Sequence, residues 1–170
     1  MVHSFAPISS DDAQVLILGS MPGKASLEAN QYYAHPQNAF WKIVERVLGL
    51  DPGTCYADKT KILTANRVAL WDVLKTCTRE SSLDSDIVES SIVPNDFKAF
   101  FASHLSVSRV YFNGAMAEKS YRKYVAPTLG EISRLTYVRL PSTSPANASL
   151  TLEAKIAAWK CIVPKHRRRQ

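Results

Sequence analysis

The chain has 170 residues, of which 46% are hydrophobic and 21% charged, a composition typical of a globular domain and unlike that of a disordered chain. The longest apolar runs, such as residues 15–18, are far too short to span a bilayer. The N-terminus has no basic start followed by a long apolar core, so we expect no secretory signal and a cytoplasmic location, on the nucleoid if the source is bacterial. The length suits one domain, which we expect to occupy residues 1–170.

A net charge of +6 arises from 21 basic and 15 acidic residues. Its position matters more than its size, because residues 164–170 form a basic tail whose cations are Lys165, Arg167, Arg168 and Arg169. Such a tail favours contact with a polyanion such as nucleic acid, through the release of counterions from the phosphates. A solvated, frayed end of the chain is the alternative interpretation.

The three cysteines, Cys55, Cys77 and Cys161, lie far apart and form no C-x-x-C pair. A structural zinc ion or an iron–sulfur cluster would therefore lack ligands. We expect reduced thiols, and neither a metal nor an organic cofactor.

The predicted strands and helices alternate along the chain. Residues 15–18 form a short apolar run ended by Gly19, which is typical of a buried parallel strand. Residues 38–48 then place apolar side chains three or four positions apart until Gly49, which indicates a helix. The same signals predict, in chain order, a strand at 68–74, a helix at 94–104, a strand at 109–112, a helix at 115–124, a strand at 136–140 and a helix at 148–162.

This alternation of strands and helices indicates an α/β fold. We expect a three-layer α/β/α sandwich with a short central, four-stranded, mainly parallel sheet. Ligands of such sheets bind beyond the carboxyl ends of the strands. That rule selects the segments that follow the predicted strands, namely 19–26, 71–72, 113–114 and 141–147.

The first segment reads G-S-M-P-G-K-A-S over residues 19–26, and its glycines let backbone N–H groups approach a ligand closely. It does not match a Walker phosphate loop, which needs four residues between its glycines and a Ser or Thr directly after its Lys. It also lacks the G-x-G-x-x-G spacing of a dinucleotide site. A plain turn after a strand is the alternative.

The second segment, residues 31–41, reads Q-Y-Y-A-H-P-Q-N-A-F-W and is dense in groups that stack and form hydrogen bonds. A tyrosine can stack on a nucleobase, and an asparagine amide can orient a water or read a base edge. Phe40 and Trp41 favour a place in the core. Asn38 has an alternative role as the N-cap of the helix that follows.

The third segment reads L-P-S-T-S-P-A-N over residues 140–147. Its three hydroxyls, held between two prolines, suit contact with phosphates. An ordinary turn is the alternative. No serine of the chain lies in a G-x-S-x-G pattern, so an esterase-type nucleophile is weakly supported.

Together, the three segments resemble the uracil-DNA glycosylase superfamily, over about residues 14–162. The second segment is similar to that of mismatch-specific uracil-DNA glycosylases. The patterns G-S-M-P-G, W-D-V-L and L-P-S-T-S-P most resemble the hypoxanthine-DNA glycosylase branch. The resemblance implies a monomer that acts on DNA containing deaminated bases, without a cofactor and without an iron–sulfur cluster.

For the base pocket, the resemblance implies that Asn38 is catalytic, either holding water near C1′ or donating to the base. It implies that Tyr33 stacks on the flipped base, that Asp72 reads its edge and that Asn113 lines the pocket. It also implies that the backbone of Ser20, Met21, Pro22 and Gly23 faces the base.

For the DNA backbone, the resemblance implies contacts by Ser26 and by the hydroxyls of Ser142, Thr143 and Ser144. Two positions depart from the superfamily pattern. Met21 stands where an Asp or Asn usually positions the attacking water, and Leu140 stands where a His or Asn usually contacts the leaving group. Both departures put uracil excision in doubt.

The implied reaction is hydrolysis of the N-glycosidic bond of a flipped deaminated base, hypoxanthine first and uracil next, which leaves an abasic site for base excision repair. We expect no strand cleavage, because no lysine of these motifs suggests a Schiff base. One alternative is a non-catalytic module that binds damaged DNA. Another is a hydrolase of small nucleosides or esters that uses Ser142 or Ser144 with His35.

Overall fold

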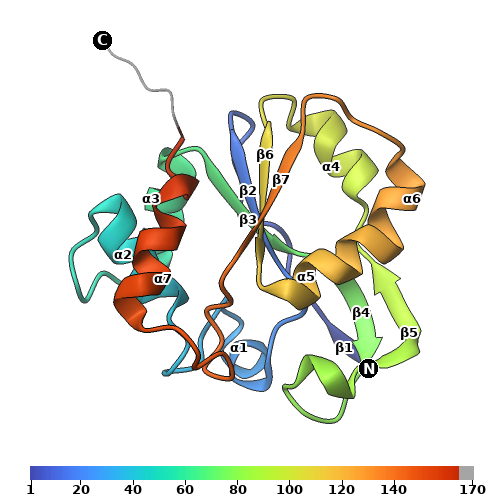
Figure 1. Cartoon of the computed structure of the whole chain (residues 1–170), viewed down its shortest axis with the longest axis horizontal. Helices are drawn as coiled ribbons and strands as arrows, with labels where there is room; N and C mark the ends of the chain where they lie inside the picture. Colours follow the sequence, from blue (N-terminus) through green and yellow to red (C-terminus); the bar gives the residue numbers. More distant parts are fainter. Residues whose placement is uncertain (165–170) are drawn as a thin grey trace.

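The computed structural model describes residues 1–164. Its centre is a sheet of four parallel strands in the order β3-β2-β6-β7 (Figure 1). In chain order, these strands are β2 (Val15–Gly19), β3 (Val68–Asp72), β6 (Arg109–Asn113) and β7 (Thr136–Leu140). Helices cover both faces of the sheet, so the predicted three-layer sandwich is confirmed.

Two groups of helices cover the sheet, one on each face (Figure 1). Side chains of β2 alternate between them: Val15 and Ile17 pack with the first group, and Leu16 and Leu18 with the second. This burial on both faces explains the continuous apolar run in the sequence. The first group is α2 (Phe40–Leu48), α3 (Tyr56–Ala65) and α7 (Leu152–Trp159), and the second is α4 (Phe97–Ser103), α5 (Ala115–Ser120) and α6 (Ala126–Leu129).

Side-chain hydrogen bonds move the starts of two predicted helices. Asn38 Oδ1 accepts the N–H of Phe40 at 2.9 Å in a turn before α2, so that helix begins at Phe40 rather than at position 38. Asp96 accepts the N–H of Ala99 at 3.0 Å and caps α4, which therefore begins at Phe97.

The last two predicted helices also differ in extent. The helix predicted at 115–124 passes through a π turn (Tyr121–Val125) directly into α6, so the helical segment runs from 115 to 129. The helix predicted at 148–162 begins only after its cap, Thr151, and ends in a short 3-10 turn, η3 (Lys160–Ile162). Residues 148–151 therefore belong to the loop that follows β7.

A second, antiparallel sheet escaped prediction. It has the order β1-β4-β5, formed by β1 (Val2–His3), β4 (Leu74–Thr78) and β5 (Val88–Pro94). The strand predicted at 68–74 is therefore wrong at its end, because β3 stops at Asp72 and the chain changes sheets at Val73. The N–H of Val73 donates to the carbonyl of Gly19 at 2.8 Å, which places this change of direction beside the end of β2.

Two short helical segments flank the carboxyl ends of the parallel strands. These are α1 (Lys24–Ala29), which follows β2, and the 3-10 turn η1 (Asp84–Asp86), which lies in the connection between β4 and β5. The cations of the predicted basic tail, residues 165–170, lie outside the described residues. Among the helices of residues 1–164, none combines the length and the apolar character that crossing a membrane requires.

Candidate active site

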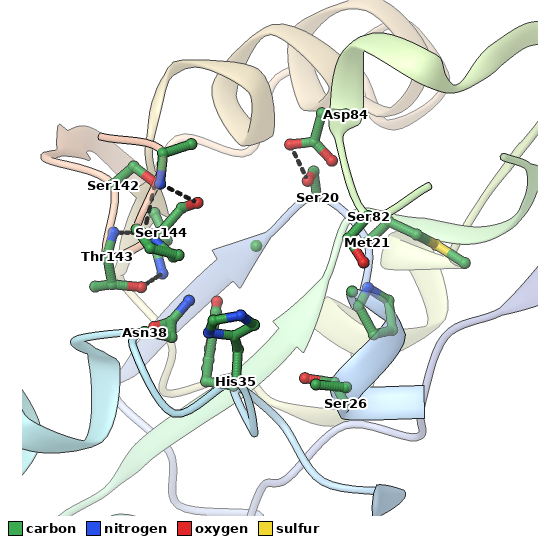
Figure 2. Close-up of a pocket in the computed structure, with 18 of the residues that line it drawn as sticks. Ser20, Met21, Ser26, His35, Asn38, Ser82, Asp84, Ser142, Thr143 and Ser144 are labelled. Atoms are coloured by element: carbon green, nitrogen blue, oxygen red, sulfur yellow. Dashed lines mark hydrogen bonds between the residues drawn. The ribbon is translucent and has the colours of Figure 1, made fainter. Parts of the chain in front are cut away.

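A cavity of about 330 Å³ lies at the carboxyl ends of the parallel strands. Three groups of residues surround it in Figure 2: Asn38 and His35, the loop of Ser142, Thr143 and Ser144, and a wall with Ser20, Met21, Ser82 and Asp84. Every residue predicted for the site lines this cavity, including Pro22, Gly23, Ser26, Tyr33, Asp72 and Asn113. The roles assigned to these residues remain predictions.

The floor of the cavity depends on the absence of a side chain at Gly19. A Cβ atom there would lie 2.6 Å from Asp72 Oδ1 and 2.7 Å from the hydroxyl of Tyr33. The register of the sheet pairs Gly19 with Asp72, which brings this carboxyl to the end of β2. Glycine is therefore required for the two polar groups to meet at the floor.

Tyr33 reaches the floor from an unusual backbone conformation. Its φ of 54° lies in the left-handed region, which non-glycine residues seldom occupy. Its ring stacks on Phe40 at a centroid distance of 4.2 Å and an angle of 24°. One face of the ring is thus covered by α2, and only the opposite face is available for the stacking on a base that the sequence predicts.

Polar atoms at the floor and behind the wall are buried without partners. Among the described residues, the buried side-chain nitrogen and oxygen atoms that lack a hydrogen bond are the Tyr33 hydroxyl, Asp72 Oδ2, and Nε and Nη1 of Arg79. Buried polar atoms in folded proteins are nearly always paired. The two oxygens at the cavity floor therefore keep hydrogen-bonding capacity that the described residues do not satisfy.

Asp72 is 3% exposed, and its surroundings make it a weaker acid than an exposed aspartate. Burial, reinforced by the charge of Asp84 and opposed by that of Arg79, raises the pKa of Asp72 to about 7. Near neutral pH, this carboxyl is therefore present in both forms. The ionised form accepts hydrogen bonds, and the protonated form can donate one.

The connection between β4 and β5 holds the loop that follows β2. Ser20 Oγ donates to Asp84 at 2.8 Å, and the N–H of Lys24 donates to Ser82 Oγ at 2.7 Å. The buried guanidinium of Arg79 donates to the carbonyl of Pro22 and lies 3.9 Å from Asp84. These contacts make a wall of the cavity from a part of the chain that sequence reasoning did not assign to the site.

Asn38 makes a contact close to its alternative role as a helix cap, and it also lines the cavity. Its Oδ1 accepts the N–H of Phe40, close to the N-cap role, although the cap position itself is Ala39. This bond fixes the amide at the cavity wall and leaves Nδ2 as its donor (Figure 2). The remaining donor can form a hydrogen bond with a ligand or with a water in the cavity.

The amide of Asn113 fastens the serine-rich loop to β6. Its Nδ2 donates to Thr143 Oγ1, and its Oδ1 accepts the N–H of Thr143, both at 2.9 Å. Thr143 is only 1% exposed, so a contact of its hydroxyl with DNA would require the loop to move. Ser26 is 5% exposed, and its hydroxyl accepts the N–H of Ala34 at 3.0 Å. Ser144 keeps exposed surface at the rim.

The geometry contradicts a serine–histidine hydrolase. His35 Nδ1 accepts the N–H of Gln37 at 3.1 Å, and within residues 1–164 no carboxylate forms a hydrogen bond with this ring to orient it as a general base. Ser142 Oγ accepts the N–H of Ser144 at 3.2 Å, and Ser144 Oγ accepts that of Ala146 at 3.2 Å. In the part of the chain that the structure describes, no hydrogen bond joins either hydroxyl to His35.

The described residues offer no group of three or more His, Cys, Asp or Glu side chains that could hold a metal ion. All three cysteines are free, with Cys77 buried and the other two exposed.

A three-layer α/β/α domain with a partly open cavity, lined by polar and apolar groups at the carboxyl edge of a short parallel sheet, belongs to the class of α/β proteins that bind ligands at this edge. Within this class, the chain belongs to the Uracil DNA glycosylase superfamily, whose family model matches residues 6–162. It is thus a DNA glycosylase, and the resemblance found in the sequence is confirmed.

Relatives and a solved structure agree with this membership. The chain is 33% identical over 158 residues to the hypoxanthine DNA glycosylase of Methanosarcina barkeri, covering 92% of this chain and 94% of that protein. It is 36% identical over 161 residues to the hypoxanthine DNA glycosylase of Methanosarcina acetivorans, covering 94% and 96%. A solution NMR structure of a candidate uracil DNA glycosylase from Methanosarcina acetivorans matches with a TM-score of 0.77 and 32% identity over 95% of each chain.

Replacing Gly19 by alanine tests how closely Asp72 and Tyr33 pack against this residue at the cavity floor. The new Cβ would clash with Asp72 and Tyr33, so we expect Gly19→Ala to destabilise the fold by about 1–3 kcal/mol, as overpacking does. Thermal unfolding measures the loss. Gly23→Ala is the matched control for stability, because its Cβ would lie at an ordinary 3.5 Å from Ser82. Equal melting temperatures for both variants would contradict the packing of the floor.

The raised pKa of Asp72 makes stability depend on pH. Because the folded state binds this proton more tightly than the unfolded chain, the stabilisation is complete below about pH 4 and is lost as pH rises to about 7. We expect Asp72→Asn to raise the melting temperature more at about pH 8 than at about pH 5. Asp11→Asn, at an exposed carboxyl, is the control. A constant difference between wild type and Asp72→Asn at both pH values would show that the carboxyl is not perturbed.

Proposed function

We propose that this protein excises hypoxanthine from DNA, and uracil as a second substrate, by hydrolysing the bond between C1′ of the deoxyribose and the base. The observation that carries the proposal is the pair of unpaired buried oxygens, on Asp72 and Tyr33, at the floor of the cavity. The hypoxanthine DNA glycosylases among the relatives support the choice of base. A volume of about 330 Å³ suits a single nucleobase.

The base enters the cavity by leaving the DNA stack. A base inside a duplex cannot reach a buried floor, and extruding it costs a few kcal/mol, less for a mispaired base. Deaminated bases are mispaired after deamination, so this cost already favours them over normal pairs. The free face of the Tyr33 ring supports the extruded base by stacking.

The floor selects the base by its hydrogen-bond pattern. Hypoxanthine and uracil each present a ring N–H beside a carbonyl, whereas adenine and cytosine present a ring nitrogen acceptor beside an amino group. Ionised Asp72 accepts the ring N–H, and the Tyr33 hydroxyl donates to the neighbouring carbonyl. The same carboxylate repels the ring-nitrogen lone pair of adenine or cytosine and leaves buried groups unpaired, so the floor separates a deaminated base from its parent. Guanine and thymine share the ring N–H and the carbonyl, and the cost of leaving a normal base pair disfavours them instead.

Bond cleavage sends the electrons of the C1′–N bond to the base, and the sugar develops oxocarbenium character. Asn38 Nδ2 donates a hydrogen bond to the base as its negative charge grows. A water then bonds to C1′, and its proton ends on the departing base, so the products are the free base and an abasic sugar. With Met21 and Leu140 in place of polar groups, the protein stabilises the leaving base rather than activating the water.

Asn38→Ala tests the catalytic assignment. We expect a 10²–10³-fold slower single-turnover excision, roughly the effect of removing one preorganised donor. The substrate is a duplex with one hypoxanthine, incubated in chelator and treated with alkali to reveal abasic sites. Gln37→Ala, at the exposed neighbouring position, is the control. Full excision by Asn38→Ala would refute the assignment, and binding of the duplex without any abasic product in wild type would refute catalysis.

The pH profile tests Asp72. If the ionised carboxylate reads the ring N–H, excision of hypoxanthine rises with pH through about 7 in wild type. We expect Asp72→Asn to be slower and to lack this rise between about pH 5.5 and about pH 8.5. The measurement is the single-turnover rate across that range. A rise of equal size in both proteins would assign the titration to another group.

A further inference from the structure

A lysine of α7 is buried behind the serine-rich loop without a counter-charge. Lys155 is 6% exposed, and its ammonium donates to the backbone carbonyl of Asn147 at 2.8 Å. Within residues 1–164, no ion pair includes it, and Glu153 is bonded instead to Arg46 at 3.1 Å. Burial lowers the pKa of Lys155, with no contribution from a neighbouring charge.

Two side chains of α7 hold the serine-rich loop at both ends. Trp159 Nε1 donates to the carbonyl of Pro141 at 2.9 Å, and Lys155, one helical turn earlier, holds Asn147. The amide of Asn147 in turn donates to the carbonyl of Ser142 at 3.2 Å. The ammonium of Lys155 is therefore two hydrogen bonds from a residue that lines the cavity.

The ammonium of Lys155 keeps donors for a further partner. The residue as a whole is 6% exposed, but its charged group is only lightly buried. Its one hydrogen bond to a carbonyl occupies one of three donors. An apolar side chain would cover the same surface, so packing alone does not explain a charge at this position.

We propose that Lys155 pairs with a phosphodiester of the DNA strand beside the extruded nucleotide, at the rim formed by the serine-rich loop. This inference rests on the proposed action on DNA. Lys155 is a positioning residue: its charge holds the strand while the sugar and base occupy the cavity. A role restricted to bracing the loop through Asn147 is the competing explanation.

The salt dependence of DNA binding separates the two explanations. The slope of log affinity against log salt counts the phosphates that a protein neutralises, at about 0.9 per contact. We expect Lys155→Met to reduce this slope by about 0.9 for a duplex with a tetrahydrofuran abasic analogue, between about 50 and 200 mM NaCl. Lys160→Met removes the same charge from the exposed far end of the segment, and its slope should equal that of wild type.

Each other outcome counts against the inference. If Lys155→Met binds DNA more weakly with an unchanged salt slope, Lys155 only braces the loop. If Lys155→Met and Lys160→Met reduce the slope equally, the effect comes from the overall positive charge of the protein and not from a contact at Lys155. Lys155→Arg, which keeps the charge, should restore the wild-type slope even if Lys155→Met folds poorly. If the wild-type protein does not bind DNA, the proposed function is refuted. If the wild-type protein excises the base but Lys155→Met leaves the salt slope of binding unchanged, only the inference about Lys155 is refuted.

Discussion

The site depends on the close approach of three groups at the end of β2. Because Gly19 has no side chain, Asp72 from β3 and Tyr33 from the segment before α2 meet over its backbone. The left-handed conformation of Tyr33 and the burial of the Asp72 carboxyl both cost free energy in the unliganded protein. Such costs are typical of functional sites, where a ligand satisfies what the fold leaves unpaired.

The small second sheet gives the cavity one of its walls. Its β4–β5 connection is anchored by Arg79 to the backbone of Pro22, and Asp84 receives the hydroxyl of Ser20. The same connection supplies the charge that, after burial, most raises the pKa of Asp72. A peripheral element therefore controls both the shape of the first loop and the acidity of the group at the floor.

Much of the fold could be predicted because the central strands are buried on both faces and the helices end at clear signals such as Gly49. The second sheet could not, since β1 has two residues and the start of β5 presents exposed polar side chains such as Glu89. The site residues after the parallel strands were found from their motifs. Arg79 and Asp84 were missed because their partners lie 57 and 64 residues away in the chain, beyond any local pattern.

Trp159 links the two halves of the site. Its ring meets Phe40, the residue beneath Tyr33, at 5.9 Å and 85°, while its N–H holds Pro141 at the start of the serine-rich loop. The spacing between the ring of Tyr33 and the rim of the cavity is consequently set when the protein folds. Under the proposed function, a free nucleoside would contact the cavity alone, whereas a nucleotide within a strand would contact both the cavity and its rim.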